Sequence, residues 1–226
     1  MADVRPAFYA LKPGGWRDYV TVLHLPYTAW NLSYVALGAA LAPHFHTGRM
    51  LWTMAAFALA LGVGAHALDE LNGRPLRTKI GNGVLVALAV ASLAGACGIG
   101  VWGAIRWDEP ALLAFVAIGA FVVPAYNLEW FGGALHNTFG LALAWAAFPV
   151  LTAYFAEANT LRPEAVLAAG YAAAMIVVQR TLSTPVRHAR RALGTTAGVE
   201  PMERSLRILP WANVLLGCAL VVARLT

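Results

Sequence analysis

The sequence has little charge for its length. Of its 226 residues, 12% are charged and 60% are hydrophobic, and the mean hydropathy is +0.64. Soluble domains carry about 25% charged and about 45–50% apolar residues. The shortage of charge excludes a soluble globular domain, and the excess of apolar residues excludes a disordered chain. A membrane protein remains.

Other absences narrow the class further. The two cysteines, Cys97 and Cys218, lie in apolar runs, so a disulfide scaffold is excluded. No alternating strand pattern, nucleotide-binding loop or CxxC motif occurs in the sequence. The net charge of +5 does not indicate a nucleic-acid partner, because positive charge in a membrane protein mostly marks its cytoplasmic loops.

Seven apolar segments approach the roughly 20 residues that a helix needs to cross a bilayer. The sequence therefore predicts an all-α, polytopic membrane protein with about seven transmembrane helices. We expect residues 1–22 to form a cytoplasmic interfacial segment, without a cleavable signal peptide, and residues 23–226 to form one transmembrane domain. The predicted spans are 25–42, 51–69, 84–105, 111–127, 134–156, 163–182 and 206–223.

Arginine and lysine are distributed unevenly over the predicted loops. Alternate loops hold 12 of the 16 basic residues, and the loops on the other side hold the remaining four, Arg49, Arg106, Arg162 and Arg224. Basic loops stay in the cytoplasm, so we expect a cytoplasmic N-terminus and an external C-terminus.

Polar residues gather at the predicted cytoplasmic ends of the spans. At the end of the second span, His66, Asp69, Glu70 and Gly73 share one helix face. Ionisable groups within spans are costly and are therefore functional candidates. Imidazole and carboxylates together favour a metal site at His66, Asp69 and Glu70. In the alternative interpretation, the two acids are solvated and pair with nearby arginines.

Further candidates lie on the same side of the membrane. Arg180 belongs to the sixth span and needs a carboxylate or the phosphates of a ligand as its partner. The basic loop that follows is either a lipid anchor or part of the same site. We expect a substrate-binding set of Asn31, Asn72, Arg74, Arg180, Arg187 and His188, with Tyr126 as a catalytic residue beside Asp69.

Two stretches resemble motifs of the UbiA superfamily of intramembrane prenyltransferases. Asp69 followed by Arg74-Pro75-Leu76 resembles the family's first aspartate motif and its Arg-Pro-Leu sequence. Tyr126, the short loop after it and the segment 137–146 resemble the family's fourth and fifth spans. The sequence departs from the family where the second aspartate motif belongs, because 183–188 contains no acid, and the family usually has nine spans.

The resemblance implies helices around a central cavity that is open to lipid. It also implies aspartate-held Mg²⁺ that binds the diphosphate of an isoprenoid, whose ionisation gives a carbocation for transfer or cyclisation. We therefore expect a divergent enzyme that acts on a prenyl diphosphate or lipid. The alternatives are a non-catalytic membrane protein that binds lipid or an assembly partner, and a metalloenzyme built on His and Asp.

Overall fold

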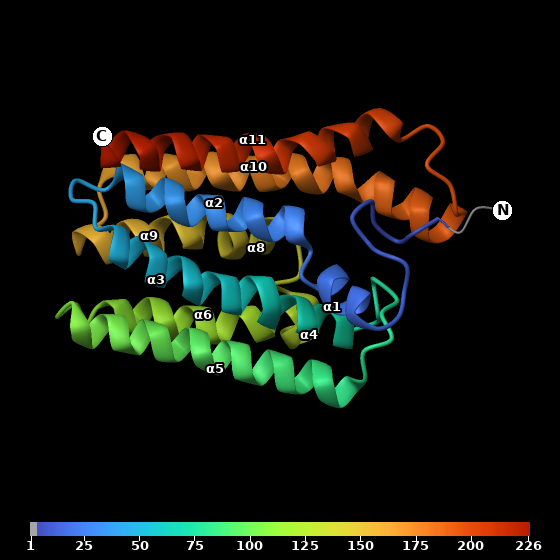
Figure 1. Ribbon diagram of the computed structural model, residues 1–226, viewed down its shortest axis with the longest axis horizontal. Helices are drawn as coiled ribbons and strands as arrows, with labels where there is room; N and C mark the ends of the chain where they lie inside the picture. The colour runs from blue at the N-terminus through green and yellow to red at the C-terminus, as the bar shows by residue number, and fades with distance from the viewer. Residues whose placement is uncertain (1–3) are drawn as a thin grey trace.

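The computed structural model describes residues 4–226, and its long helices run side by side along one axis (Figure 1). The described residues form helices and turns without any strand. The first three residues of the expected interfacial segment 1–22 lie outside this range. The elements are α1 (Trp16–Val22), α2 (Leu25–Leu41), α3 (Thr47–Phe57), η1 (Ala58–Ala65), α4 (His66–Leu71), α5 (Asn82–Arg106), α6 (Leu112–Asn127), α7 (Trp130–Gly133), α8 (Thr138–Ala142), η2 (Leu143–Ala147), α9 (Phe148–Ala158), α10 (Pro163–His188), η3 (Ala189–Leu193) and α11 (Glu200–Leu225).

Five continuous helical segments are long and apolar enough to cross a membrane, which is compatible with a multi-pass membrane protein. Two shorter helices complete the bundle: α2 has 17 residues, and α6, which is apolar, has 16. All seven correspond to predicted spans. The five longer segments are Thr47–Leu71, Asn82–Arg106, Thr138–Ala158, Pro163–Leu193 and Glu200–Leu225.

Several helix ends differ from the predicted boundaries. The fifth predicted span begins at Thr138 instead of 134, because the Asn137 side chain caps the helix by accepting from the backbone N–H of Gly140. Before it, Phe131 and Gly132 have positive φ angles that interrupt helical structure. The sixth and seventh segments extend beyond their apolar cores into polar sequence, where Arg190 and Glu203 pair with each other.

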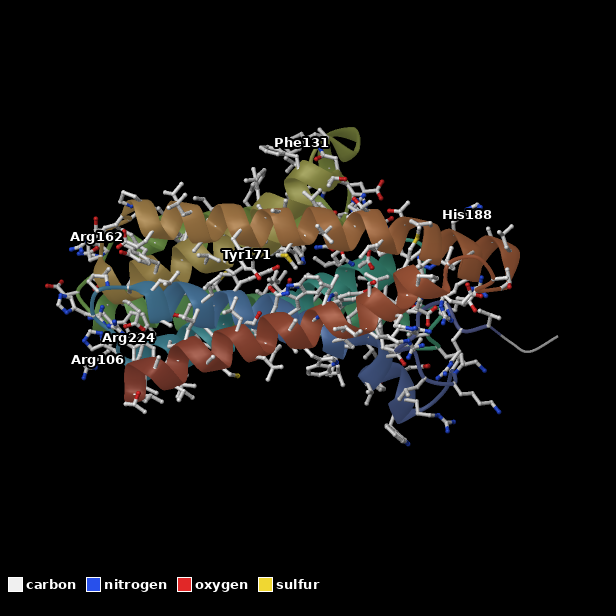
Figure 2. All side chains as sticks on the ribbon, turned by 90° about the horizontal axis from the view of Figure 1, so that it is seen from above. Arg106, Phe131, Arg162, Tyr171, His188 and Arg224 are labelled. Atoms are coloured by element: carbon white, nitrogen blue, oxygen red, sulfur yellow. The ribbon has the colours of Figure 1, made fainter. Side chains whose placement is uncertain are left out.

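The bundle has two distinct ends. The basic end comprises residues 4–24, 72–81 and 194–199, which lie at the end where the chain begins. The opposite end carries the C-terminus, and Arg106, Arg162 and Arg224 lie there, far from His188 (Figure 2).

Helix α2 is the central packing element. It packs closely on α9 and α11, where glycines allow the backbones to approach. A Cβ atom on Gly38 would overlap the carbonyl oxygen of Val150, and one on Gly217 would lie 3.1 Å from that of Ser33. Small residues at such crossings are typical of helices that pack in lipid. Large apolar side chains such as Ile105, Leu167 and Leu215 remain exposed on the outside of the bundle.

The opposite end is held together by contacts to two buried carboxylates, Glu109 and Glu157. Arg49 of α3 contacts Glu109 at 2.5 Å and donates to the carbonyl of Ala156 at 2.8 Å. His46 contacts the buried Glu157 carboxylate with its ring and its backbone N–H. These contacts join the 42–46 and 107–111 turns to α9.

Candidate functional site

A cavity of about 400 Å³ lies at the basic end of the bundle. It is lined by α2, α4, α6, α8, η2, α10, η3 and α11, together with residues 6–9 of the N-terminal segment. Its lining residues include His24, Tyr27, Trp30, Asn31, His66, Asp69, Tyr126, His136, Trp145, Gln179, Arg180, Arg187, Arg190 and Arg191. Side chains that are far apart in the sequence therefore meet in one space, as the predicted site requires.

Asp69 is the only carboxylate among the described residues that line this cavity. The preceding segment η1 has the wide i→i+5 hydrogen-bond pattern of a π-helix, which often occurs at functional sites. His66, at the start of α4, hydrogen-bonds the carbonyl of Gly62 through Nδ1 at 3.2 Å. Asp69 follows one turn later, so α4 presents both groups to the cavity.

Tyr126 and Arg180 meet across the cavity from α6 and α10. The Arg180 guanidinium donates to the Tyr126 hydroxyl at 3.2 Å. Tyr126 also stacks against His136 and lies 4.5 Å, between ring centroids, from Trp145. Arg180 has no ion pair within residues 4–226, so its charge is available to an anionic ligand.

Four arginines of one continuous helical segment, Pro163–Leu193, line the cavity, and three of them form a row. Arg180, Arg187 and Arg191 are separated by seven and four residues, and this spacing places them on one face of a helix. Arg191 belongs to η3, another π-helical turn. A row of guanidinium groups along one wall favours phosphate, because each group can bind two oxygens in its plane.

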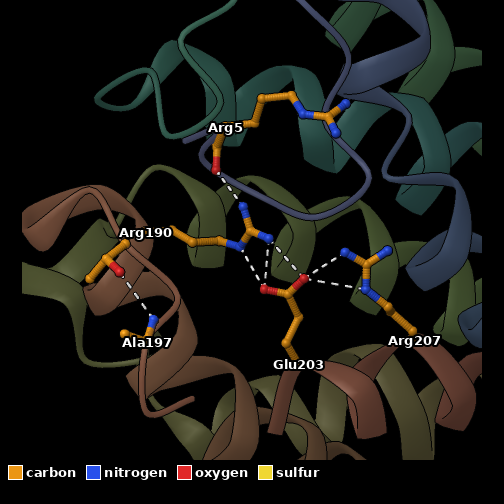
Figure 3. A network of polar contacts seen from close by, with 6 residues as sticks. Arg5, Arg190, Ala197, Glu203 and Arg207 are labelled. Atoms are coloured by element: carbon orange, nitrogen blue, oxygen red, sulfur yellow. Dashed lines mark hydrogen bonds and ion pairs between the residues drawn. The ribbon is translucent and has the colours of Figure 1, made fainter. Parts of the chain in front are cut away.

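Arg190 faces a different partner. Its guanidinium binds both oxygens of Glu203 at 2.8 Å, and Arg207 binds the same carboxylate at 2.6 Å (Figure 3). Arg190 also donates to the carbonyl of Arg5 at 3.0 Å, which fixes the N-terminal segment beside the cavity. Arg207 lies over the ring of Phe8 at 4.8 Å. Glu203 thus holds α11, η3 and the N-terminal segment together.

The N-terminal segment closes one side of the cavity with aromatic rings. Phe8 and Tyr9 of this segment both line the cavity. The Tyr9 hydroxyl hydrogen-bonds Nδ1 of His24 at 2.9 Å, and the His24 ring stacks on His66 with centroids 4.0 Å apart. Burial, reinforced by repulsion from His66, holds the pKa of His24 well below its ordinary value. Burial also raises the pKa of Tyr9.

The deeper wall of the cavity is aromatic and aliphatic. Trp30 and Asn31 of α2 face Leu141, Trp145 and Ile176 there. Trp30 is 1% exposed, and its indole N–H has no partner within residues 4–226. The cavity therefore has a charged mouth and an apolar interior, which suits a ligand with an anionic head and an apolar tail.

Four predicted site residues lie outside this lining. Glu70 is buried and accepts three hydrogen bonds from Leu76 and Thr78, so its carboxylate organises the 72–81 loop. Arg74 donates to the backbone of Thr78 and Ile80 in the same loop. Asn72 and His188 are exposed, and Asn72 donates to the carbonyl of Asn127.

The sequence did not single out several residues that line the cavity as site residues, chiefly Tyr9, Tyr27 and Gln179. Two signals were present. Tyr27 lies one turn before Trp30 and Asn31, and Gln179 is a polar residue in an apolar segment, next to Arg180. For Tyr9 the sequence gives no such signal, because its position depends on how the N-terminal segment folds back.

The described side chains of the cavity do not form a cluster of metal ligands. Among residues 4–226, no three His, Cys, Asp or Glu side chains are grouped closely enough to hold a metal ion. Of the expected ligands His66, Asp69 and Glu70, only the first two line the cavity. The cavity offers guanidinium groups where the family resemblance implies a second cluster of aspartates.

Comparison with known proteins gives no relative: no family model, no curated protein and no solved structure matches this chain.

Proposed function

We propose that the chain is an intramembrane enzyme that acts on a prenyl diphosphate or a similar phosphorylated isoprenoid lipid. The observation that carries this proposal is the convergence of Asp69, Tyr126, Arg180 and Arg187 on one cavity with an aromatic interior. These residues come from three helices, α4, α6 and α10, and Asp69, Tyr126 and Arg180 lie more than 50 positions apart in the sequence. The resemblance to the UbiA superfamily supports the same substrate class.

The proposed substrate lies with its diphosphate at the arginine row and its tail along the apolar wall. Arg180 and Arg187 neutralise the leaving group, and Tyr126 positions Arg180 through their hydrogen bond. The tail contacts Trp30, Trp145 and the aliphatic residues beside them. Aromatic faces stabilise a nearby cation, and a dry cavity protects it from water.

In the proposed reaction, the bond between the allylic carbon and the diphosphate oxygen breaks, and the electron pair leaves with the diphosphate. The allylic cation then forms a bond with a nucleophilic atom of an acceptor, or with a double bond of its own chain. The product loses a proton, which the Asp69 carboxylate accepts. No hydrogen bond from residues 4–226 occupies this carboxylate.

The proposal includes the orientation of the chain. Seven crossings place the basic end in the cytoplasm and the C-terminus outside, in agreement with the distribution of basic residues. A cytoplasmic cavity mouth gives a water-soluble prenyl diphosphate direct access to the arginine row.

Turnover by the Asp69→Asn variant tests the proposed function. In purified protein reconstituted in lipid vesicles, diphosphate release from prenyl diphosphates of several chain lengths is measured with and without Mg²⁺. We expect the substitution to lower kcat by about 100-fold or more, because the proton acceptor is lost while the size of the side chain is kept. Asp108→Asn, at the exposed opposite end, is the matched control and retains turnover.

Three results would contradict all or part of the proposal. If wild-type protein binds a prenyl diphosphate but releases no diphosphate with any acceptor, the chain is a lipid-binding protein that kept the cavity. This second function is favoured by the single carboxylate in a cavity with four arginines. If Asp69→Asn leaves turnover unchanged, Asp69 has no part in the reaction. One tightly bound zinc or iron per chain would favour the metalloenzyme instead.

A further inference from the structure

We infer that Arg180, Arg187 and Arg191 together bind the diphosphate without a divalent cation. This inference rests on the proposed function and specifies how its substrate is recognised. The group that the arginines bind is the anionic diphosphate headgroup of the isoprenoid, without a metal ion on it. The affinity therefore increases with the charge of the headgroup, from the alcohol to the monophosphate to the diphosphate.

The balance of charge in the cavity carries the inference. Four guanidinium groups and one carboxylate line it. Glu203 neutralises Arg190 with two hydrogen bonds, so three arginines remain against Asp69 alone. A cavity with an excess of positive charge attracts an anion and repels a free divalent cation.

The three arginines have weak partners within the described chain. Arg180 contacts the Tyr126 hydroxyl, and Arg187 contacts Thr184 of its own helix at 3.5 Å. None of the three forms an ion pair with a carboxylate of residues 4–226. Guanidinium groups brought together in one cavity repel one another, and a bound diphosphate relieves that repulsion.

The acids that a metal-bound diphosphate needs are engaged or missing. Glu70 is buried beneath the 72–81 loop and accepts hydrogen bonds from two residues of that loop. The stretch 183–188 contributes Ser183, Val186 and Arg187 to the cavity and no acid. The arginine row therefore stands where a second metal-binding cluster would have to lie.

Binding of a non-cleavable prenyl S-thiolodiphosphate tests the inference. The dissociation constant for the full chain in detergent micelles is measured by calorimetry, once with EDTA and once with millimolar Mg²⁺. The corresponding monophosphate and alcohol are measured beside it. Single variants Arg187→Gln and Arg191→Gln are compared with Arg204→Gln, an exposed arginine on α11 that does not line the cavity. Thermal unfolding confirms that each variant is folded.

We expect an affinity that EDTA changes by less than about threefold, and a loss of about 10–100-fold in each cavity variant, since each removes a charge-assisted contact. Arg204→Gln binds like the wild type. A dissociation constant that rises more than tenfold in EDTA overturns the inference and leaves the proposed function standing. Failure to bind the analogue in both conditions overturns the inference and the proposed function together. Equal binding of diphosphate and alcohol also overturns the inference, because the headgroup would then contribute nothing.

Discussion

At the scale of single residues, the ionisable side chains within apolar segments are the part of the site that can be predicted from the sequence. His66, Asp69 and Arg180 are ionisable residues within apolar segments, and their cost in a membrane makes them stand out in the sequence itself. Glu70 has the same signal, but its hydrogen-bond donors are backbone N–H groups of a loop, whose path the sequence does not reveal. Arg74, an expected substrate-binding residue, instead donates to the carbonyl of Ile80 in the same loop, and the sequence does not reveal that contact either.

His24 makes the stability of the protein depend on pH. Burial is the chief cause that lowers the pKa of His24 in the folded state. As the pH falls, the unfolded chain therefore binds a proton at His24 before the folded chain does. Stability from this group is fully present above the ordinary histidine pKa of about 6.5 and is lost as the pH falls below it. We expect the melting temperature in detergent to fall between pH 7.5 and pH 5. The corresponding free energy of unfolding falls by at most about 1.4 kcal/mol per pH unit through this one group.

His24→Asn should flatten that pH dependence, because asparagine does not titrate and tolerates the left-handed conformation of residue 24, at φ 46°. His188→Asn, an exposed histidine, is the matched control and keeps the wild-type slope. An unchanged slope in His24→Asn would show that another group causes the loss of stability at low pH.

At the scale of the helix, the sequence located all seven apolar segments but not their ends. Proline and glycine punctuate the turns, so the centres of the segments are clear. The ends depend on contacts between distant residues: α11 begins at Glu200 because Glu203 pairs with Arg190, 13 residues earlier, and α8 begins at Thr138 because Asn137 caps it. The three π-helical turns have no sequence signal of their own.

Gly38 provides a test of the packing between α2 and α9. A methyl group at residue 38 would meet the backbone of Val150, which cannot move aside like a flexible side chain. We expect Gly38→Ala to lower the free energy of unfolding by about 1–3 kcal/mol, measured by thermal or denaturant unfolding in detergent. Gly170→Ala, on the exposed face of α10 with open space around it, should be neutral or slightly stabilising. Equal stability of the two variants would contradict the close approach of α2 and α9.

At the scale of the whole molecule, the number of crossings decides where the cavity opens. Five helical segments meet the length and composition of a span, and α2 and α6 are shorter. Each of the two lies beside longer helices in the bundle, and α2 packs on α9 and α11. The prediction of seven crossings rests on the apolar content of each segment and not on the length of its helix alone.

Labelling with a membrane-impermeant thiol reagent tests this topology. In a variant without the native Cys97 and Cys218, single cysteines replace Arg204 at the basic end and Arg162 at the opposite end. We expect Arg204→Cys to react only from the cytoplasmic side and Arg162→Cys only from outside. Reaction of both from one side would rule out seven crossings, and with them a cytoplasmic mouth for the cavity.

The ion pair between Arg49 and Glu109 has a consequence for biogenesis. The two partners are 60 residues apart, so the ribosome delivers the arginine to the translocon well before its acid is synthesised. Until the turn between α5 and α6 emerges, the charge on Arg49 lacks this counter-charge and must be stabilised by water or lipid phosphates. The ion pair that ties the first helical hairpin to the rest of the bundle therefore forms only after the third hydrophobic segment has been synthesised.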